Sequence, residues 1–168
     1  MKGALDVHRE LLARDVPHEI VRLPRVVLQA DELPDALALS PQRCVAVRMY
    51  VADGDLVAVA VQAGHTPDPT ALLAALGCRA LRPASAEEVN RRTDYAAGLV
   101  CPVLLPGDVP LYADADLGSH DVLYAPTGDT GTALGIRTGD LLVVSGARIA
   151  DLARPLTEIV LVLDLDNV

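Results

Sequence analysis

Residues 44–61 read CVAVRMYVADGDLVAVAV, and this stretch decides the predicted fold. Two Val-rich runs, 44–51 and 56–61, flank a short turn that contains Gly54, which is a good signal for a β-hairpin. Side chains alternate across a strand, so the faces of the first run can be assigned. One face carries Val45, Val47, Met49 and Val51, and the other carries Cys44, Ala46, Arg48 and Tyr50. We expect the valine face to lie in the core.

Capping residues and apolar spacing predict helices around this hairpin. Asp68 and Gly77 bound a helix over 69–76, and Ser85 begins another over 85–92. The remaining predicted helices cover 4–14, 29–39 and 139–144. Short strands are expected at 18–23, 78–81, 102–105, 109–113, 121–125, 132–137 and 159–165. No repeat or linker interrupts these elements, so we expect one α+β domain over residues 1–168.

The composition narrows the classes of function. The net charge of −9 argues against a protein that binds long stretches of nucleic-acid backbone, because such binding depends on clustered Lys and Arg. It does not exclude contact with a short nucleic-acid end. Three cysteines without CxxC spacing are typical of reduced thiols and argue against a disulfide framework or a zinc site. No apolar stretch approaches the roughly 20 residues that cross a bilayer. We therefore expect a cytoplasmic protein without a membrane anchor.

Four segments, in this order, resemble the YbaK/EbsC-like family, which also includes the editing insertion domain of prolyl-tRNA synthetases. They are the hairpin 44–61, PTALLAALGCRALRPASAEEV at 69–89, TDYAAG at 93–98 and PTGDTGTALGIRTGDLLVV at 126–144. The resemblance covers about residues 5–150, which leaves 151–168 as a C-terminal extension. It implies a mixed, β-barrel-like sheet with helices on its outside.

The same resemblance implies hydrolysis of the ester that joins a wrong amino acid to the 3′ end of tRNA. Alanine or cysteine on the proline tRNA is the usual substrate, and no metal or organic cofactor is implied. The expected partner is the 3′ end of an aminoacyl-tRNA, with an aminoacyl-tRNA synthetase as a second candidate. A monomer and a homodimer both fit.

The glycine-rich segment 127–131 is the predicted source of hydrogen-bond donors for the reacting ester, because backbone N–H groups without side chains can approach a ligand closely. The predicted catalytic residues are Gly128, Asp129 and Gly131. The predicted substrate-binding residues are Arg48, Ala46, Thr130, Tyr95, Gly98 and His65. A plain turn for the loop, and a solvent-facing strand position for Arg48, are the alternatives.

One departure from the family affects the chemistry directly. Its usual Lys-Thr pair falls on Ala46 and Val47, and Ala46 offers neither charge nor donor. Arg48 projects from the same strand face, but a guanidinium cannot act as a base. Two hypotheses therefore stay open. The chain is a trans-acting aminoacyl-tRNA deacylase, or it is a non-catalytic relative that binds an aminoacyl ester, a nucleotide or a protein.

Overall fold

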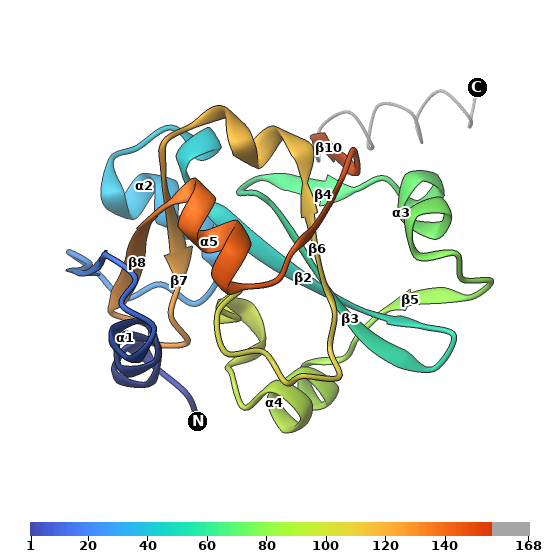
Figure 1. The fold of residues 1–168 in the computed structure, drawn as a ribbon, viewed down its shortest axis with the longest axis horizontal. Helices are drawn as coiled ribbons and strands as arrows, with labels where there is room; N and C mark the ends of the chain where they lie inside the picture. The colour runs from blue at the N-terminus through green and yellow to red at the C-terminus, as the bar shows by residue number, and fades with distance from the viewer. Residues whose placement is uncertain (156–168) are drawn as a thin grey trace.

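The predicted hairpin lies at the centre of the structure, a computed structural model that describes residues 1–155 (Figure 1). Strands β2 (Val45–Ala52) and β3 (Asp55–Gln62) pair antiparallel, from Val45 opposite Gln62 to Ala52 opposite Asp55. Asp53 and Gly54 have φ of 48° and 89°, as a two-residue hairpin turn requires. The hairpin prediction is confirmed.

The hairpin belongs to a five-stranded sheet with the order β5-β2-β3-β6-β9. Its other strands are β5 (Leu81–Pro83), β6 (Leu111–Asp114) and β9 (Arg148–Ala150). β5 runs antiparallel to β2, whereas β6 and β9 continue the sheet with parallel pairing. This mixture confirms a mixed sheet.

Two smaller antiparallel sheets complete the strands. One has the order β1-β8-β7 and contains β1 (His18–Arg22), β7 (Val122–Pro126) and β8 (Thr132–Arg137). The other pairs β4 (His65–Pro67) with β10 (Ala153–Pro155). Within residues 1–155 the strands thus form three hydrogen-bonded sheets, and they do not close into one barrel.

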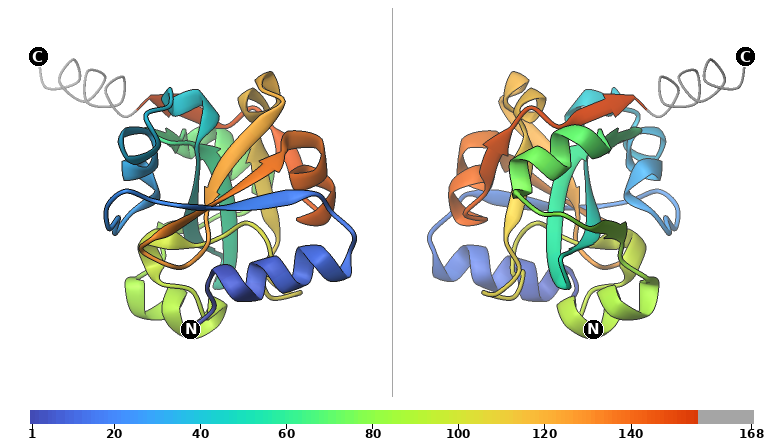
Figure 2. Two further views of the ribbon diagram at one scale, coloured as in Figure 1. Left: turned by 90° about the vertical axis from the view of Figure 1, so that its left-hand side faces the viewer. Right: turned by 90° about the vertical axis from the view of Figure 1, so that its right-hand side faces the viewer.

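Within residues 1–155, five α-helices lie around the sheets, and Figure 2 shows α1 beside β1 on one side of the molecule. They are α1 (Ala4–Ala13), α2 (Leu33–Leu37), α3 (Pro69–Leu76), α4 (Ala86–Thr93) and α5 (Thr138–Val144). The 3₁₀ turns are η1 (Ala30–Glu32), η2 (Pro41–Arg43), η3 (Ala97–Leu99) and η4 (Ala115–Ser119). The helices predicted at 4–14, 69–76 and 85–92 are confirmed, whereas 29–39 divides into η1 and α2. No helix in the described part of the chain is long and apolar enough to span a membrane.

The strand predicted at 102–105 is wrong, for a reason that the side chains provide. The carbonyl oxygen of Val103 accepts a hydrogen bond from the hydroxyl of Tyr95, and that of Leu104 accepts one from the ammonium of Lys2. Leu104 also has a φ of 63°, outside the extended region. Hydrogen bonds from side chains thus take the place of the backbone hydrogen bonds that a neighbouring strand would donate. The strand predicted at 78–81 begins only at Leu81, and the one predicted at 159–165 lies outside the described residues.

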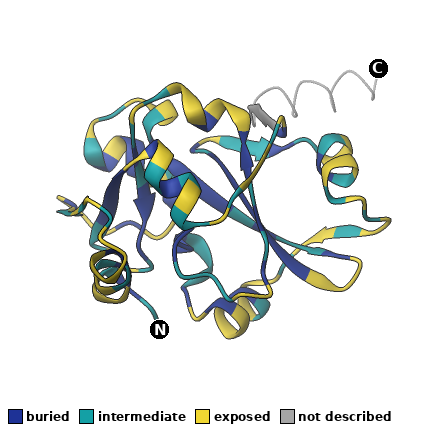
Figure 3. Cartoon of the chain, viewed as in Figure 1, coloured by how far each residue is buried: buried dark blue, intermediate teal, exposed yellow. Residues whose placement is uncertain are grey.

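Both faces of β2 are covered, which corrects the expectation of a single core face. Val45, Val47 and Met49 belong to one buried cluster, as predicted. Cys44 and Ala46, on the opposite face, are fully buried in a second cluster. Figure 3 accordingly draws most of the central hairpin as buried. A strand of this kind sits between two layers, so its side chains can reach a site on either side.

Candidate functional site

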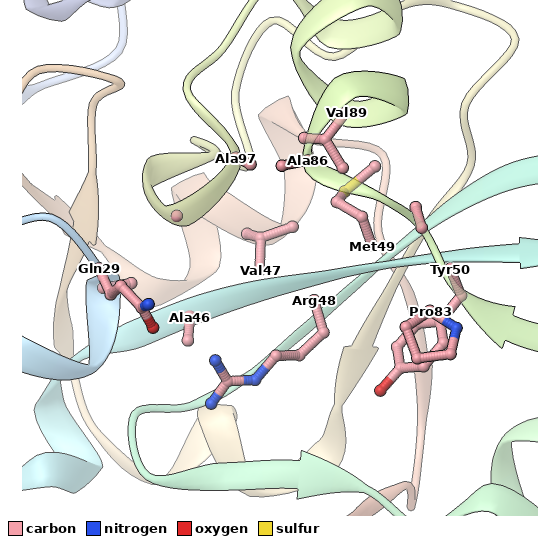
Figure 4. Close-up of a pocket in the computed structure, with 13 residues that line it drawn as sticks. Gln29, Ala46, Val47, Arg48, Met49, Tyr50, Pro83, Ala86, Val89 and Ala97 are labelled. Carbon is pink, nitrogen blue, oxygen red and sulfur yellow. The ribbon is translucent and has the colours of Figure 1, made fainter.

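The middle of β2 forms one wall of a pocket with a volume of about 360 Å³ (Figure 4). The other walls come from the segment before α2, the link from β5 to α4, and η3. The lining residues are 29–30, 46–50, 83–84, 86, 89 and 97–98. Nine of these thirteen residues are Ala, Val, Met or Pro, but polar atoms contribute more of the accessible wall than apolar atoms do. Such a pocket suits a small group that has an apolar part and also makes polar contacts.

Three residues predicted from the sequence meet at this pocket: Ala46, Arg48 and Gly98. Ala46 contributes only a methyl group. The single lysine of the chain, Lys2, lies elsewhere, where its ammonium donates to the carbonyl oxygen of Leu104 and stands 4.7 Å from the ring centre of Tyr95. Because Lys2 is the one lysine in the sequence, no lysine ammonium lies in the pocket.

Arg48 is held by two neighbouring segments. Its Nη1 and Nη2 donate to the two carboxylate oxygens of Asp31 at 2.7 and 2.8 Å, and its Nε and Nη2 donate to the carbonyl oxygen of His65 at 3.2 and 2.6 Å. Burial alone would raise the pKa of Asp31. The hydrogen bonds from Arg48 and from the amide of Gly64 outweigh burial and hold that pKa below its usual range. An ordinary solvent-facing role for Arg48 is therefore wrong.

Gly98 allows the pocket wall to approach the segment before α2. A β-carbon at this position would lie 2.3 Å from the carbonyl oxygen of Leu28 and 3.3 Å from Cγ of Gln29. Any larger residue would push the two segments apart. The glycine thus fixes the width of the pocket at this point.

Gln29 is a lining residue that sequence reasoning missed. Its amide and that of Leu28 donate to one carboxylate oxygen of Glu32 at 2.8 and 2.7 Å. These two bonds lower the pKa of Glu32. In return the Glu32 amide donates to the carbonyl oxygen of Gln29 at 3.0 Å. A glutamate three residues after Gln29 is a local sequence signal of this turn.

The glycine-rich loop is not part of the pocket lining, and it packs against the N-terminal segment instead. The Asp129 carboxylate accepts a hydrogen bond from the amide of Ala4, at the start of α1, at 2.7 Å. The carbonyl oxygens of Thr130 and Gly131 accept from the amides of Val27 and Leu23. The loop thus supports the segment that leads to Gln29. The catalytic roles of Gly128, Asp129 and Gly131 and the substrate contact of Thr130 stay predictions.

Tyr95 and His65 also lie outside the lining of this pocket. Tyr95 is fully buried, its hydroxyl donates to the carbonyl oxygen of Val103 at 2.6 Å, and burial raises its pKa. His65 contributes its backbone oxygen to Arg48, and its Nδ1 is buried without a partner among the described residues. Substrate contacts by these two side chains stay predictions.

Cys101 does not line the pocket, and its thiol is not reactive. Burial raises the pKa of the Cys101 thiol to about 12, so this side chain stays protonated at neutral pH and is a poor nucleophile. No group of three or more His, Cys, Asp or Glu side chains that could hold a metal ion occurs in residues 1–155. What the pocket offers is therefore shape and hydrogen bonding.

Comparisons with known proteins agree with one another on the kind of domain. Residues 25–143 match the family model for the aminoacyl-tRNA editing domain. Over 86 residues, or 51% of the chain, the sequence is 37% identical to proline–tRNA ligase of Moorella thermoacetica. The chain spans only 15% of that ligase.

Solved structures give the same result at the level of the fold. A crystal structure described as a candidate trans-editing enzyme for prolyl-tRNA synthetase has a TM-score of 0.73 and 27% identity, over 82% of this chain and 87% of its own. A hypothetical protein with a TM-score of 0.81 covers 88% of this chain and 99% of its own, at 24% identity. At that identity the second likeness shows the fold alone.

Proposed function

The chain belongs to the aminoacyl-tRNA editing domain family, as its sequence resemblance predicted, and we propose that it hydrolyses misacylated tRNA in trans. The substrate that we propose is the proline tRNA carrying alanine or cysteine, bound through its 3′ end. One observation carries this proposal. The pocket on β2 unites Ala46, Arg48 and Gly98, and all three lie within the span that matches the family.

The pocket suits an aminoacyl ester on physical grounds. Ester hydrolysis needs a positioned water, donors for the developing oxyanion, and a cavity that selects the acyl group. Val47, Met49 and Val89 provide an apolar wall against which a methyl or thiol side chain can rest. Gly98 lets its wall lie directly against Leu28 and Gln29, which sets the width of the pocket at this point.

Arg48 has a restricted role in this proposal. A guanidinium has five N–H donors, and the four bonds to Asp31 and His65 leave one of them for a substrate phosphate or hydroxyl. Its principal contribution is to hold the walls of the pocket in place.

Binding without hydrolysis is the second candidate function, and a specific observation favours it. Ala46 stands where relatives carry lysine, and the one lysine of the chain is engaged with Leu104. A pocket without that side chain could still hold an aminoacyl ester.

Release of amino acid from a panel of mischarged tRNAs distinguishes the two functions. We expect the wild-type protein to deacylate alanyl- or cysteinyl-tRNA(Pro), and Ala46→Lys to raise the rate by restoring the ammonium group. Ala46→Met is the matched control, because it fills the same space without charge and should lower the rate. If the wild type and Ala46→Lys both fail on every substrate while circular dichroism shows a folded protein, hydrolysis is abandoned in favour of binding.

A further inference from the structure

We propose that the side-chain amide of Gln29 donates a hydrogen bond to the ester carbonyl oxygen of the bound aminoacyl group, in the pocket that lacks a lysine. This inference rests on the proposed function, because it takes an aminoacyl ester as the ligand. It adds a residue that neither the family match nor the sequence motifs single out.

Few side chains in the pocket can donate a hydrogen bond. Among the lining residues only Gln29, Arg48 and Tyr50 carry a nitrogen or oxygen in the side chain. Arg48 already directs four of its N–H groups at Asp31 and His65. In Figure 4 the hydroxyl of Tyr50 lies beside Pro83, well along β2 from Ala46.

Gln29 differs from Arg48, because its side-chain NH₂ group donates to no acceptor within residues 1–155. Figure 4 draws its carboxamide at the end of the pocket where Ala46 lies. An amide NH₂ has two donors, so it can satisfy a carbonyl oxygen and a ribose hydroxyl together. Gln29 is therefore a free neutral donor at the Ala46 end of the pocket.

The backbone around Gln29 is fixed although its side chain is exposed. Glu32 accepts hydrogen bonds from the amides of Leu28 and Gln29. Asp31, two residues after Gln29, pairs with Arg48. A β-carbon added to Gly98 would lie 3.3 Å from Gln29 Cγ, so the two segments pack closely at this point. A donor on such a fixed segment reaches the ligand with little rearrangement of the main chain.

The chemical step needs no proton transfer by Gln29. A water oxygen forms a bond to the ester carbon, the carbonyl oxygen gains negative charge, and the bond from that carbon to the ribose oxygen then breaks. A proton of the attacking water ends on the ribose oxygen, giving free amino acid and the tRNA 3′ hydroxyl. The Gln29 N–H stabilises the charged oxygen, and such a donor contributes most in the transition state.

The test compares Gln29→Ala and Gln29→Glu with the wild type in single-turnover hydrolysis of alanyl-tRNA(Pro) at saturating protein. Glutamate has the shape of glutamine, but an ionised glutamate can only accept hydrogen bonds and cannot donate one. We expect both variants to lose about 100-fold in rate. Gln42→Ala, an exposed glutamine in η2 outside the pocket, is the matched control and should keep the wild-type rate. Retention of the wild-type rate by Gln29→Glu would overturn the inference and leave the proposed hydrolysis intact.

A binding measurement covers the case in which the wild type hydrolyses nothing. The probe is 3′-alanylamido-3′-deoxyadenosine, whose stable amide carbonyl accepts the same hydrogen bond. If the Kd rises about tenfold in both Gln29 variants but not in Gln42→Ala, the Gln29 contact is supported even where the wild type shows no hydrolysis. Equal Kd values in all four proteins overturn the inference. Failure of all four to bind overturns the contact and the proposed function together.

Discussion

The guanidinium of Arg48 joins three segments that are separate in the sequence. It extends from β2, binds Asp31 in η1 with both carboxylate oxygens contacted, and binds the carbonyl oxygen of His65 in β4. Bidentate pairing of this kind fixes direction as well as distance. The Arg48 side chain is 23% exposed and that of Asp31 is 29% exposed, so the pair is partly shielded from water. The pocket wall that carries Gln29 depends on this contact.

Removing the guanidinium should cost stability. We expect Arg48→Ala to lower the free energy of unfolding by about 2 kcal/mol, because Asp31 and the His65 carbonyl lose charge-assisted hydrogen bonds. Arg91→Ala is the control, because its contact with Glu87 is 3.7 Å long and exposed. Exposed pairs contribute about 0–1 kcal/mol. Urea unfolding measures both, and equal effects would show that the Arg48 contact is no stronger than a surface pair.

At the scale of elements, the glycine-rich loop has a structural role that its sequence did not reveal. Gly128 has a φ of 95°, and a β-carbon there would lie 2.4 Å from the carbonyl oxygen of Lys2 and 2.8 Å from the Tyr95 ring. Gly131 has neither restriction, since nothing lies within 4 Å of its added β-carbon. Two glycines of one loop are therefore under different constraints.

This difference separates folding from catalysis experimentally. We expect Gly128→Ala to lower the free energy of unfolding by about 2–3 kcal/mol, through backbone strain and displacement of the N-terminal segment. Gly131→Ala should change it by at most about 0.5 kcal/mol. If Gly131→Ala leaves thermal unfolding unchanged but abolishes deacylation, the predicted catalytic role of the loop gains support. A stable Gly128→Ala protein would contradict the packing argument.

Helix α4 begins with a reciprocal cap that should respond to pH. The Ser85 hydroxyl accepts from the Glu88 amide at 3.2 Å, and the Glu88 carboxylate accepts from the Ser85 amide at 2.7 Å. The Arg82 guanidinium donates to both oxygens of this carboxylate, and these two bonds, with the cap as the smaller cause, lower the pKa of Glu88 to about 2. A lowered folded-state pKa stabilises the protein above the ordinary value of 4.5, and this contribution is lost as the pH falls toward 2.

The corresponding measurement follows wild type and Glu88→Gln by urea unfolding from pH 6 to pH 2. We expect wild type to be the more stable protein at pH 6, and its advantage to shrink mainly between pH 4.5 and pH 2. Glu87→Gln is the control, because the Glu87 side chain is 86% exposed and its ion pair is 3.7 Å long. An advantage that stays constant across this range would contradict the assigned cause.

At the scale of the whole molecule, two buried clusters lie on opposite faces of the β2–β3 hairpin. The second cluster reaches Leu152, which is 1% exposed and nine residues beyond the end of the family match. The amide of Leu152 donates to Asp114 at 2.8 Å, and its carbonyl oxygen accepts from the amide of Asp68 at 2.6 Å. Residues 151–155, expected to be part of an extension, thus complete the core and the β4–β10 sheet.

Leu152→Ala should therefore behave as a core substitution. We expect it to lower the free energy of unfolding by about 3 kcal/mol, the usual result of removing a buried leucine side chain. Ile149→Ala removes a similar volume from a residue that is 60% exposed and should cost under about 1 kcal/mol. Thermal or urea unfolding distinguishes them, and similar losses would mean that Leu152 does not belong to the core.

The sequence by itself determined the local elements and the chemical departure at position 46. Caps such as Asp68 and Ser85 and the turn at Gly54 act within a few residues, so their effects can be predicted without knowing the rest of the chain. The hairpin, the helices at 69–76 and 85–92, and the α+β class all followed from such signals, whereas the mixed sheet was implied by the family resemblance. Counting back from the turn also placed Ala46 where the family resemblance implies a lysine.

Only the tertiary structure decided which side chains meet. Asp129 caps a helix that begins 125 residues earlier, and Tyr95 and Lys2 satisfy the carbonyls that a strand at 102–105 would have used. Gln29 enters the pocket because Gly98 admits its segment, and Arg48 is engaged because Asp31 lies beside it. Periodicity and capping describe one element at a time, whereas these contacts depend on how distant elements pack to cover both faces of one hairpin.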